Sequence, residues 1–366
     1  MKKIMHKLSK VSLFITSVFC SGIGYAYPNT YTATFLDTPN GLDSIAYDVN
    51  EAGQIVGMTY NFNKGSDYAI ATLWNGVAAT YLNTPAGNMS YASDINNAGQ
   101  VVGVISQGYG SRAALWNGST LTYLETPIGS NSQANAINDS GQVVGNIIST
   151  PSVPIATMWN SNNTIKPETL SAGSFLPYDI NNSGQIVGVE GQNATKWEGN
   201  KINSLSAFGQ ASVANSINNR GQVIGTSYGI QNVATLWNNN IPTYLDTLGI
   251  GSSGGDINDV GQAVGSSYMD HSYSTYSLAA TLWNDNTPTN LNDFLSQNLK
   301  NEGWILSAAT AINNKGVIIG YADNKNNGTR RPFVLSPAPE PETYAMMLLG
   351  IGLVGIAKRR HNKTGC

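Results

Sequence analysis

The sequence predicts an all-β protein, a β-propeller of about seven blades. Three observations support this fold class. A block of the form Asp-Ile-Asn-Asn-x-Gly-Gln-Val-Val-Gly recurs seven times along the 366 residues. A strand that contains tryptophan follows six of the seven copies, and the copies are spaced like propeller blades rather than like leucine-rich or ankyrin repeats. Closing such blades into a ring removes exposed sheet edges without any disulfide bridge.

The block itself predicts a β-hairpin. In the second copy Asn96 and Asn97 can cap a type I turn through their side chains, and Gly99 can take the left-handed conformation that forms a G1 bulge. Gly103 is expected to end the next strand and to let neighbouring blades approach closely. The structural turn residues of the repeat are therefore predicted to be Asn50 and Gly53, Asn96 and Gly99, Asn138 and Gly141, Asn181 and Gly184, Asn218 and Gly221, Asn258 and Gly261, and Asn313 and Gly316.

Two further elements complete each unit. Residues 71–75 exemplify the aromatic strand, and residues 80–85 exemplify an element that is expected to open the unit. Successive turn asparagines are 46, 42, 43, 37, 40 and 55 residues apart. Because the last spacing is long and residues 332–335 take the place of the tryptophan strand in the seventh unit, a six-bladed ring or a β-solenoid is the alternative. Trp304 could fill part of the gap.

Calcium binding is a second interpretation of the block. Its first, third and sixth positions match the oxygen, oxygen and glycine of an EF-hand loop. Its fifth position, however, holds mostly residues that do not bind cations, such as Ala98, Arg220 and Val260, and no copy supplies a glutamate at position twelve. Turn chemistry is therefore the preferred interpretation, and neither a metal nor a cofactor is expected.

The N-terminus predicts export. Lysines precede an apolar run at residues 11–20, and the small residue Ala26 follows it, a pattern typical of a secretory signal peptide cleaved after Ala26. A permanent anchor is the weaker alternative, since the run is too short for a stable membrane span. The two cysteines, Cys20 and Cys366, both lie in terminal segments, so the exported part would have to fold without a disulfide.

The C-terminus predicts a sorting signal. An acidic proline motif, an apolar run and a basic stop follow one another: Pro339, Glu340 and Pro341, then residues 344–357, then Lys358, Arg359 and Arg360. The basic stop places the bulk of the chain outside the cytoplasm. This segment resembles the PEP-CTERM sorting signal of Gram-negative bacteria. The resemblance implies export, transient insertion in the inner membrane with the ectodomain in the periplasm, recognition by an exosortase, and cleavage near Pro-Glu-Pro. A plain membrane anchor is the alternative.

The repeat region resembles the HAF-type extracellular repeat of exported bacterial proteins. The Ile-Asn-Asn-x-Gly-Gln-Val-Val-Gly block and the Ala-Thr-Leu-Trp-Asn strand carry this resemblance, although the His-Ala-Phe strand that names the repeat is replaced, for example by Tyr68-Ala69-Ile70. The expected organisation is a signal peptide at 1–26, a HAF-like repeat propeller at 27–336, a linker at 337–343, a transmembrane sorting helix at 344–357 and a basic cytoplasmic tail at 358–366.

Charge and composition favour a binding or structural role over catalysis. Residues 27–338 contain 11 basic and 20 acidic side chains, a formal charge of −9, which argues against nucleic acid as a partner. His271, in a polar insert of the sixth unit, is the one imidazole between the two processing signals. The recurring acids at the start of the hairpins suit a structural role better than a unique site: Asp48, Asp94, Asp179 and Asp256.

The expected function is therefore that of an exported cell-surface or extracellular-matrix protein, associated with exopolysaccharide or biofilm and processed by an exosortase. Exopolysaccharide and other surface proteins are the expected binding partners, and the candidate sugar contacts are Tyr60, Tyr91, Tyr109, Tyr228 and Tyr276. The alternative is a polysaccharide-acting hydrolase on the same scaffold. It would need a pair of carboxylates about 5 to 9 Å apart or the insert around Asp270 and His271.

Overall fold

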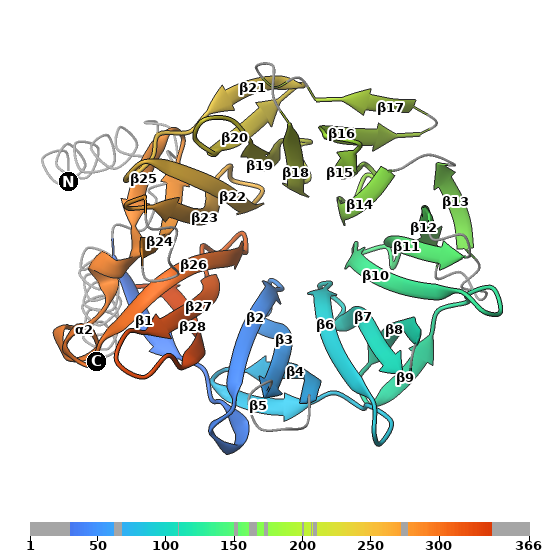
Figure 1. The fold of residues 1–366 in the computed structure, drawn as a ribbon, viewed down its shortest axis with the longest axis horizontal. Coiled ribbons are helices and arrows are strands. Elements are labelled where there is room, and N and C mark those ends of the chain that lie inside the picture. Colours follow the sequence, from blue (N-terminus) through green and yellow to red (C-terminus); the bar gives the residue numbers. More distant parts are fainter. Residues whose placement is uncertain are drawn as a thin grey trace, which may run out of the picture.

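A computed structural model describes residues 30–61, 68–108, 110–149, 153–160, 167–171, 175–199, 201–205, 207, 211–271 and 277–338 (Figure 1). Within these ranges the strands form seven four-stranded antiparallel sheets, arranged as blades around a central axis. The predicted seven-bladed β-propeller is thus confirmed, and the six-bladed ring and the β-solenoid are wrong. The expected signal peptide, sorting helix and cytoplasmic tail lie outside the described residues. No helix in the described part of the chain is long and apolar enough to span a bilayer.

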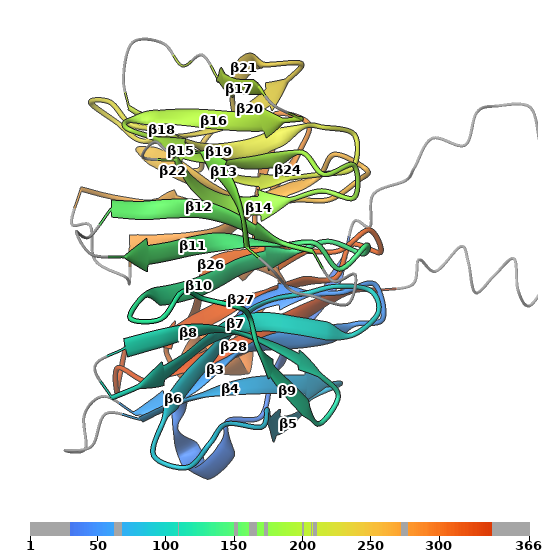
Figure 2. The same ribbon diagram turned by 90° about the vertical axis from the view of Figure 1, so that its right-hand side faces the viewer.

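Each blade runs from an innermost strand beside the axis to an outermost strand at the rim (Figures 1 and 2). The first three blades consist of β2 (Asp43–Val49), β3 (Gln54–Asn61), β4 (Tyr68–Asn75) and β5 (Ala78–Tyr81); β6 (Met89–Ile95), β7 (Gln100–Gln107), β8 (Gly110–Asn117) and β9 (Thr120–Tyr123); and β10 (Asn131–Ile137), β11 (Val143–Ser149), β12 (Val153–Trp159) and β13 (Pro167–Ser171). The next three consist of β14 (Phe175–Ile180), β15 (Ile186–Glu190), β16 (Asn193–Glu198) and β17 (Lys201–Ser204); β18 (Ser212–Ile217), β19 (Val223–Ser227), β20 (Val233–Asn238) and β21 (Ile241–Tyr244); and β22 (Gly251–Ile257), β23 (Ala263–Tyr268), β24 (Leu278–Asn284) and β25 (Thr287–Asn290).

Blade 7 joins the two ends of the described chain. Its strands, from axis to rim, are β26 (Trp304–Ile312), β27 (Ile318–Asn324), β28 (Arg330–Pro337) and β1 (Tyr31–Phe35). The N-terminal strand β1 pairs antiparallel with β28, so that Tyr31 lies opposite Pro337. Ladder hydrogen bonds between the first and last strands therefore close the ring.

This closure corrects the expected phase of the repeat. The element exemplified by residues 80–85 was expected to open each unit, but β5, β9 and β21 are the rim strands of the blades that precede them in the chain. The sequence repeat is one strand out of phase with the blade because β1, the first copy of this element, completes blade 7 instead of starting blade 1.

The glycine of each second strand avoids a steric clash within its own blade, not between blades. Gly103 lies within β7, opposite Ala92 at a β-bulge of β6, and does not end the strand. A Cβ atom added there would lie 2.0 Å from the backbone oxygen of Tyr91, in the same blade. The expectation that Gly103 brings neighbouring blades together is therefore wrong. The equivalent glycines of the other blades would make the same clash, at 1.9 to 2.0 Å: Gly57, Gly145, Gly188, Gly225, Gly265 and Gly320.

Tryptophans of the third strands fasten blades 1, 2, 3 and 6 to their predecessors. The indole nitrogen of Trp116 donates a hydrogen bond to the backbone oxygen of Asn83, 2.7 Å away in the connection that leaves blade 1. Trp74, Trp159 and Trp283 make the equivalent bond at other interfaces. These side chains are fully buried within apolar clusters that span two blades. Because an aromatic side chain of this kind buries about 150–250 Å², the core is distributed over the blade interfaces.

A helical insert explains the longest spacing. Between β25 and β26 the chain forms the 3-10 turn η3 (Leu291–Phe294) and the short helix α2 (Gln297–Asn301); another 3-10 turn, η1 (Pro39–Gly41), precedes β2. Phe294 packs edge-on against Tyr31, with ring centroids 5.1 Å apart, and Trp304 packs against Phe35 at 4.8 Å. The insert therefore covers the rim strand that closes the ring.

Candidate functional site

One end of the propeller axis is formed by the seven predicted turns, and we call it the hairpin face. Each turn asparagine ends an innermost strand, and the glycine three residues later has a positive φ, for example +77° at Gly99. The side-chain oxygen of Asn96 accepts hydrogen bonds from the backbone N–H of Ala98 and Gln100, which fixes the turn. Because this oxygen accepts two backbone hydrogen bonds, its role in the turn explains the motif without a cation.

The turn asparagines also link all seven blades in a closed ring. The side-chain amide of Asn96 donates to the backbone oxygen of Asn138 in the next blade, 3.1 Å away. The same contact joins every neighbouring pair, at 2.9 to 3.1 Å, and the last one returns from Asn313 to Asn50. We call this set of bonds the asparagine ring.

The residue after each turn asparagine forms a second, outer ring. Asn97 was expected to cap its own turn, but its side-chain oxygen accepts a hydrogen bond from the backbone N–H of Glu51 in the preceding blade, at 2.9 Å. The six other positions repeat this contact, at 2.6 to 2.9 Å. That expectation is therefore wrong: the second side chain binds blade to blade.

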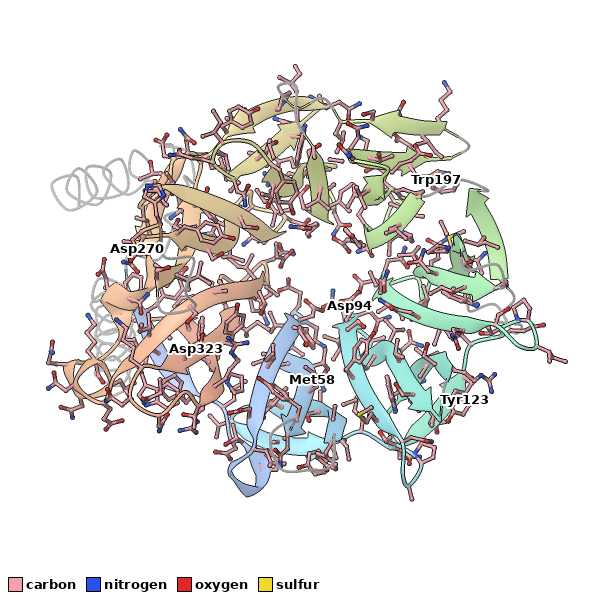
Figure 3. All side chains as sticks on the ribbon, viewed as in Figure 1. Met58, Asp94, Tyr123, Trp197, Asp270 and Asp323 are labelled. Carbon is pink, nitrogen blue, oxygen red and sulfur yellow. The ribbon has the colours of Figure 1, made fainter. Side chains whose placement is uncertain are left out.

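Four carboxylates lie just inside the asparagine ring, on the innermost strands. Figure 3 shows Asp94 near the axis, whereas Trp197 and Tyr123 lie toward the rim. Asp94 accepts the backbone N–H of Ile137 in the next blade, at 2.6 Å, and Asp179 and Asp256 make equivalent contacts. The structure thus brings together acids that are far apart in sequence and uses them to hold strands.

Burial raises the pKa of Asp94, Asp179 and Asp256. Burial is the largest cause for Asp94, and the nearby carboxyl of Asp48 adds to it, so the Asp94 pKa lies well above its ordinary range. Burial also raises the pKa of Asp256 to about 7, against a hydrogen bond from Ser216 that lowers it. The Ser216 hydroxyl lies 2.9 Å from Asp179 and 2.6 Å from Asp256. Since it has only one hydrogen, one of these contacts requires a proton on a carboxyl.

The opposite end of the axis carries a large cavity, and we call it the tyrosine cavity. It is open and has a volume of about 790 Å³. No charged side chain lines it within the described residues. Its walls carry three phenols, two thioethers, seven alcohol or amide groups, alanines and glycines: Tyr47, Tyr91, Tyr321, Met58, Met89, Ser90, Ser93, Ser106, Asn215, Ser253, Ser266, Thr310, Ala69, Ala308, Ala309, Gly254, Gly255 and Gly265.

The phenols of this cavity are half-buried and remain protonated over a wide pH range. Burial, with smaller contributions from Tyr60 and Tyr91, raises the pKa of Tyr47 to about 12. Burial likewise raises the pKa of Tyr91. Within the described residues the hydroxyls of Tyr47 and Tyr91 have no hydrogen-bond partner. They can therefore offer both a ring face and a hydroxyl to a ligand.

Sequence reasoning found part of this site. Of the candidate sugar contacts, Tyr91 lines the cavity, Tyr60 lies on the neighbouring strand β3 opposite Asp43, and Tyr228 is 43% exposed between β19 and β20. Tyr109 and Tyr276 lie outside the described residues. Tyr47 and Tyr321 were missed. Tyr47 could have been found from its place in the repeat, because it is the bulged residue between Ala46 and Asp48 of an innermost strand.

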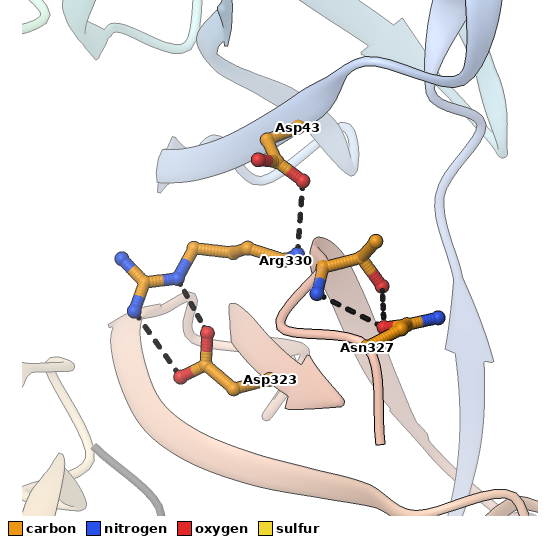
Figure 4. A network of polar contacts seen from close by, with 5 residues as sticks. Asp43, Asp323, Asn327 and Arg330 are labelled. Atoms are coloured by element: carbon orange, nitrogen blue, oxygen red, sulfur yellow. Dashed lines mark hydrogen bonds and ion pairs between the residues drawn. The ribbon is translucent and has the colours of Figure 1, made fainter. Parts of the chain in front are cut away.

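A charged pair supports one wall of the tyrosine cavity (Figure 4). The guanidinium of Arg330 binds both carboxylate oxygens of Asp323, at 2.7 and 3.2 Å, and lies 4.1 Å from the centre of the Tyr321 ring. The backbone N–H of Arg330 donates to Asp43 of blade 1, at 3.0 Å. The seam between the last and first blades is thus fastened at this end as well.

The two residues of the insert that could have carried catalysis, Asp270 and His271, do not line the tyrosine cavity. His271 is exposed in the turn that follows β23 and does not line the tyrosine cavity. Asp270 lines a separate pocket of about 430 Å³ at the rim, beside Trp304 and Lys300. Among the described residues no group of three or more His, Cys, Asp or Glu side chains could hold a metal ion.

The fold and the C-terminal sequence define a class of protein, a seven-bladed propeller that carries a sorting signal. Residues 337–360 match the model of the PEP-CTERM protein-sorting motif. This motif marks the chain for processing by an exosortase and for sorting through the membrane to the cell surface. No curated protein matches the chain.

Solved structures match the fold alone. The β-propeller domain of the Trilobed protease from Pyrococcus furiosus has a TM-score of 0.55 at 10% identity, covering 81% of this chain and 97% of that domain. YCF48, solved with a D1 peptide bound, has a TM-score of 0.53 at 11% identity, covering 86% and 97%. TolB from Acinetobacter baumannii has a TM-score of 0.46 at 10% identity, and this chain covers 66% of its length.

Proposed function

We propose that this protein is a non-catalytic component of the cell surface or extracellular matrix, which binds an uncharged polysaccharide in the tyrosine cavity. The predicted signal peptide and the C-terminal motif would deliver it there after processing. The observation that carries the proposal is the lining of the cavity. Aromatic rings, hydroxyls and an amide surround about 790 Å³ without a charged group, which suits stacking and hydrogen bonding to neutral sugars.

The same geometry disfavours the alternative, a hydrolase. Glycoside hydrolysis needs two carboxylates about 5 to 9 Å apart on either side of the scissile bond. No carboxylate lines the tyrosine cavity within the described residues. The clustered carboxylates at the hairpin face accept backbone hydrogen bonds from neighbouring blades, as Asp94 does from Ile137. Their role in holding the ring leaves no acid and base for a reaction in the cavity.

Affinity electrophoresis of the purified propeller through gels that contain dextran, mannan or a neutral β-glucan tests this proposal. At least one of these polysaccharides should retard the wild-type protein. Tyr91→Ala should weaken the retardation about tenfold or more, because it removes a cavity wall residue of the kind that dominates binding. Tyr244→Ala is the matched control, since Tyr244 is 38% exposed on the rim strand β21.

Two outcomes would contradict the proposal. One is a wild-type protein that migrates unretarded through every neutral polysaccharide gel. The other is equal retardation of the two variants, which would place the binding surface outside the cavity. YCF48 is described with a bound peptide, so retention of an extended peptide instead of a polysaccharide would assign the cavity to a different ligand class.

A further inference from the structure

Both ends of the described chain leave the propeller at one place. The backbone N–H of Ala338 donates to the oxygen of Thr30, at 3.0 Å, directly beyond the pairing of Tyr31 with Pro337. The sorting motif begins at residue 337, which is still part of β28. No spacer therefore separates the folded blade from the start of the motif.

The strand register shows on which face this place lies. In blade 1 Ile55 pairs with Trp74, and the hairpin around Gly76 then joins the third strand to the fourth. In blade 7 the equivalent pair is Ile318 and Leu335, so Pro337 corresponds to Gly76. The two chain ends thus replace a hairpin of blade 7.

That hairpin position belongs to the hairpin face. In blade 6 the side chain of Gln262, in the asparagine turn, donates to Asn284 at the end of the third strand, at 2.9 Å. In blade 4 Gln185 bonds Glu198 in the same way, at 2.8 Å. Third-strand ends and asparagine turns therefore lie side by side, and the chain leaves from that face.

The tyrosine cavity lies at the other end of the same strands. Met89 and Ser106, which line it, pair at the start of β6 and near the end of β7, whereas Asn96 follows the opposite end of β6. The chain exit and the cavity are consequently on opposite faces of the propeller.

The tether between the propeller and the apolar run is short. Five residues lie between Ala338 and Tyr344, so the six Cα–Cα steps from one to the other span about 20 Å at most. A domain of this size has a radius of gyration of about 20 Å. A tether no longer than this radius cannot bring the far face of the propeller to the bilayer.

We propose that the hairpin face lies against the lipid surface while the sorting helix is in the membrane, and that the tyrosine cavity faces away from it. This inference rests on the membrane insertion that the proposed function assumes. Its partner is a phospholipid headgroup surface, met by hydrogen-bonded turns and by the amide and carboxylate side chains of the outer ring, among them Asp139 and Asp259. Polysaccharide could then reach the cavity before the chain is released.

Two single cysteines at opposite ends of one strand test this orientation. Arg220 is exposed in the asparagine turn before β19, and Ile230 is 101% exposed in the connection after β19. The unprocessed chain, isolated from cells without exosortase, would carry Cys20→Ser and Cys366→Ser, with either Arg220→Cys or Ile230→Cys. Each variant is labelled with a fluorophore and placed in vesicles of phosphatidylethanolamine and phosphatidylglycerol that contain a headgroup nitroxide lipid.

Quenching should be stronger at position 220 than at position 230 by about twofold or more, because a strand with its two turns separates the positions by about 20 Å. The difference should vanish for the chain that ends at Ala338, added to the same vesicles. Equal quenching in the anchored chain, or stronger quenching at position 230, would overturn the orientation. A full-length chain that does not float with the vesicles would overturn the anchoring itself. Neither readout contains a sugar, so the polysaccharide proposal can fail independently.

Discussion

The side-chain amide of Asn313 donates a hydrogen bond to the backbone oxygen of Asn50, 3.0 Å away, across 263 residues of sequence. Six other asparagines make the same contact between consecutive blades. The seam that closes the ring therefore has the same hydrogen bonding as the seams within the chain. It also gains Lys315, whose amine donates to the backbone oxygen of Glu51 at 2.6 Å.

Replacing one ring asparagine by aspartate should destabilise the protein. In Asn96→Asp the turn-capping oxygen is kept, but the donor to the Asn138 oxygen is lost and a carboxylate replaces it. The Asn138 oxygen keeps its bond from the backbone N–H of Gly141, but it loses one partner and then faces a carboxylate oxygen. Losing a buried hydrogen bond to an acceptor of this kind costs about 1–3 kcal/mol, so the urea midpoint should fall accordingly. Asn75→Asp, at an exposed strand end, should change the unfolding free energy little. Equal effects of the two substitutions would show that the interblade bond contributes nothing.

Alanine substitutions at two glycines can distinguish the cost of a steric clash from the cost of backbone strain. Gly103→Ala would place a methyl group 2.0 Å from the Tyr91 oxygen, so β6 and β7 would have to move apart. Gly118→Ala meets open space, but its φ of +58° costs about 1–2 kcal/mol. Urea unfolding should show the larger loss for Gly103→Ala, with loss of folding as the extreme result. A milder effect at Gly103 than at Gly118 would contradict the steric explanation.

The sequence predicted the propeller because its repeat is local. The asparagine and glycine of each turn act within a few residues, so hairpins such as the one at Asn96 and Gly99 could be recognised without knowledge of their neighbours. The period then gave the number of blades. The role of Asn97 could not be predicted, because its partner, Glu51, lies in another blade.

The cavity was less predictable than the fold for the same reason. Tyr47, Tyr91 and Tyr321 come from different blades and different strand positions, and only ring closure brings them to one end of the axis. The recurring acids were assigned a structural role, but the contacts of Asp179 and Asp256 with Ser216 join three consecutive blades and could not be foreseen. Which residues of different blades meet around the axis cannot be predicted from the period of a single sequence.

The ion pair between Arg330 and Asp323 should stabilise the folded protein and the wall of the tyrosine cavity. Arg330→Gln removes the charge that pairs with Asp323, whose side chain is 7% exposed, and leaves this carboxylate unpaired. Breaking a buried pair in this way costs about 3–5 kcal/mol, and partial exposure of Arg330 reduces that figure. Thermal unfolding of Arg330→Gln, Asp323→Asn and the double variant should show a smaller loss in the double variant than the two single losses combined. Additive losses would mean that the pair makes no net contribution.

The buried acids should make stability depend on pH. The pKa of Asp256 is about 7 in the folded protein and has the ordinary value of 3.8 when exposed. The folded state therefore binds more protons between these values, so the free energy of unfolding should fall as pH rises through this window. Asn mimics the protonated acid, and Asp256→Asn should therefore show a shallower fall between pH 5 and pH 8 in urea titrations. Asp94 retains part of the slope, because its pKa is raised as well.

Asp139 supplies a control of opposite sign. Burial acts to raise its pKa, but hydrogen bonds from Asn97 and Asn182 outweigh this and lower the pKa below 3.8. Its stabilising contribution is present above the unfolded value and is lost as pH falls through the folded one. Asp139→Asn should therefore leave the slope between pH 5 and pH 8 unchanged and reduce only the loss of stability below about pH 4. If Asp256→Asn instead keeps the wild-type slope above pH 5, the proton shared around Ser216 does not belong to Asp256, and Asp179, the other carboxyl in contact with Ser216, must hold it.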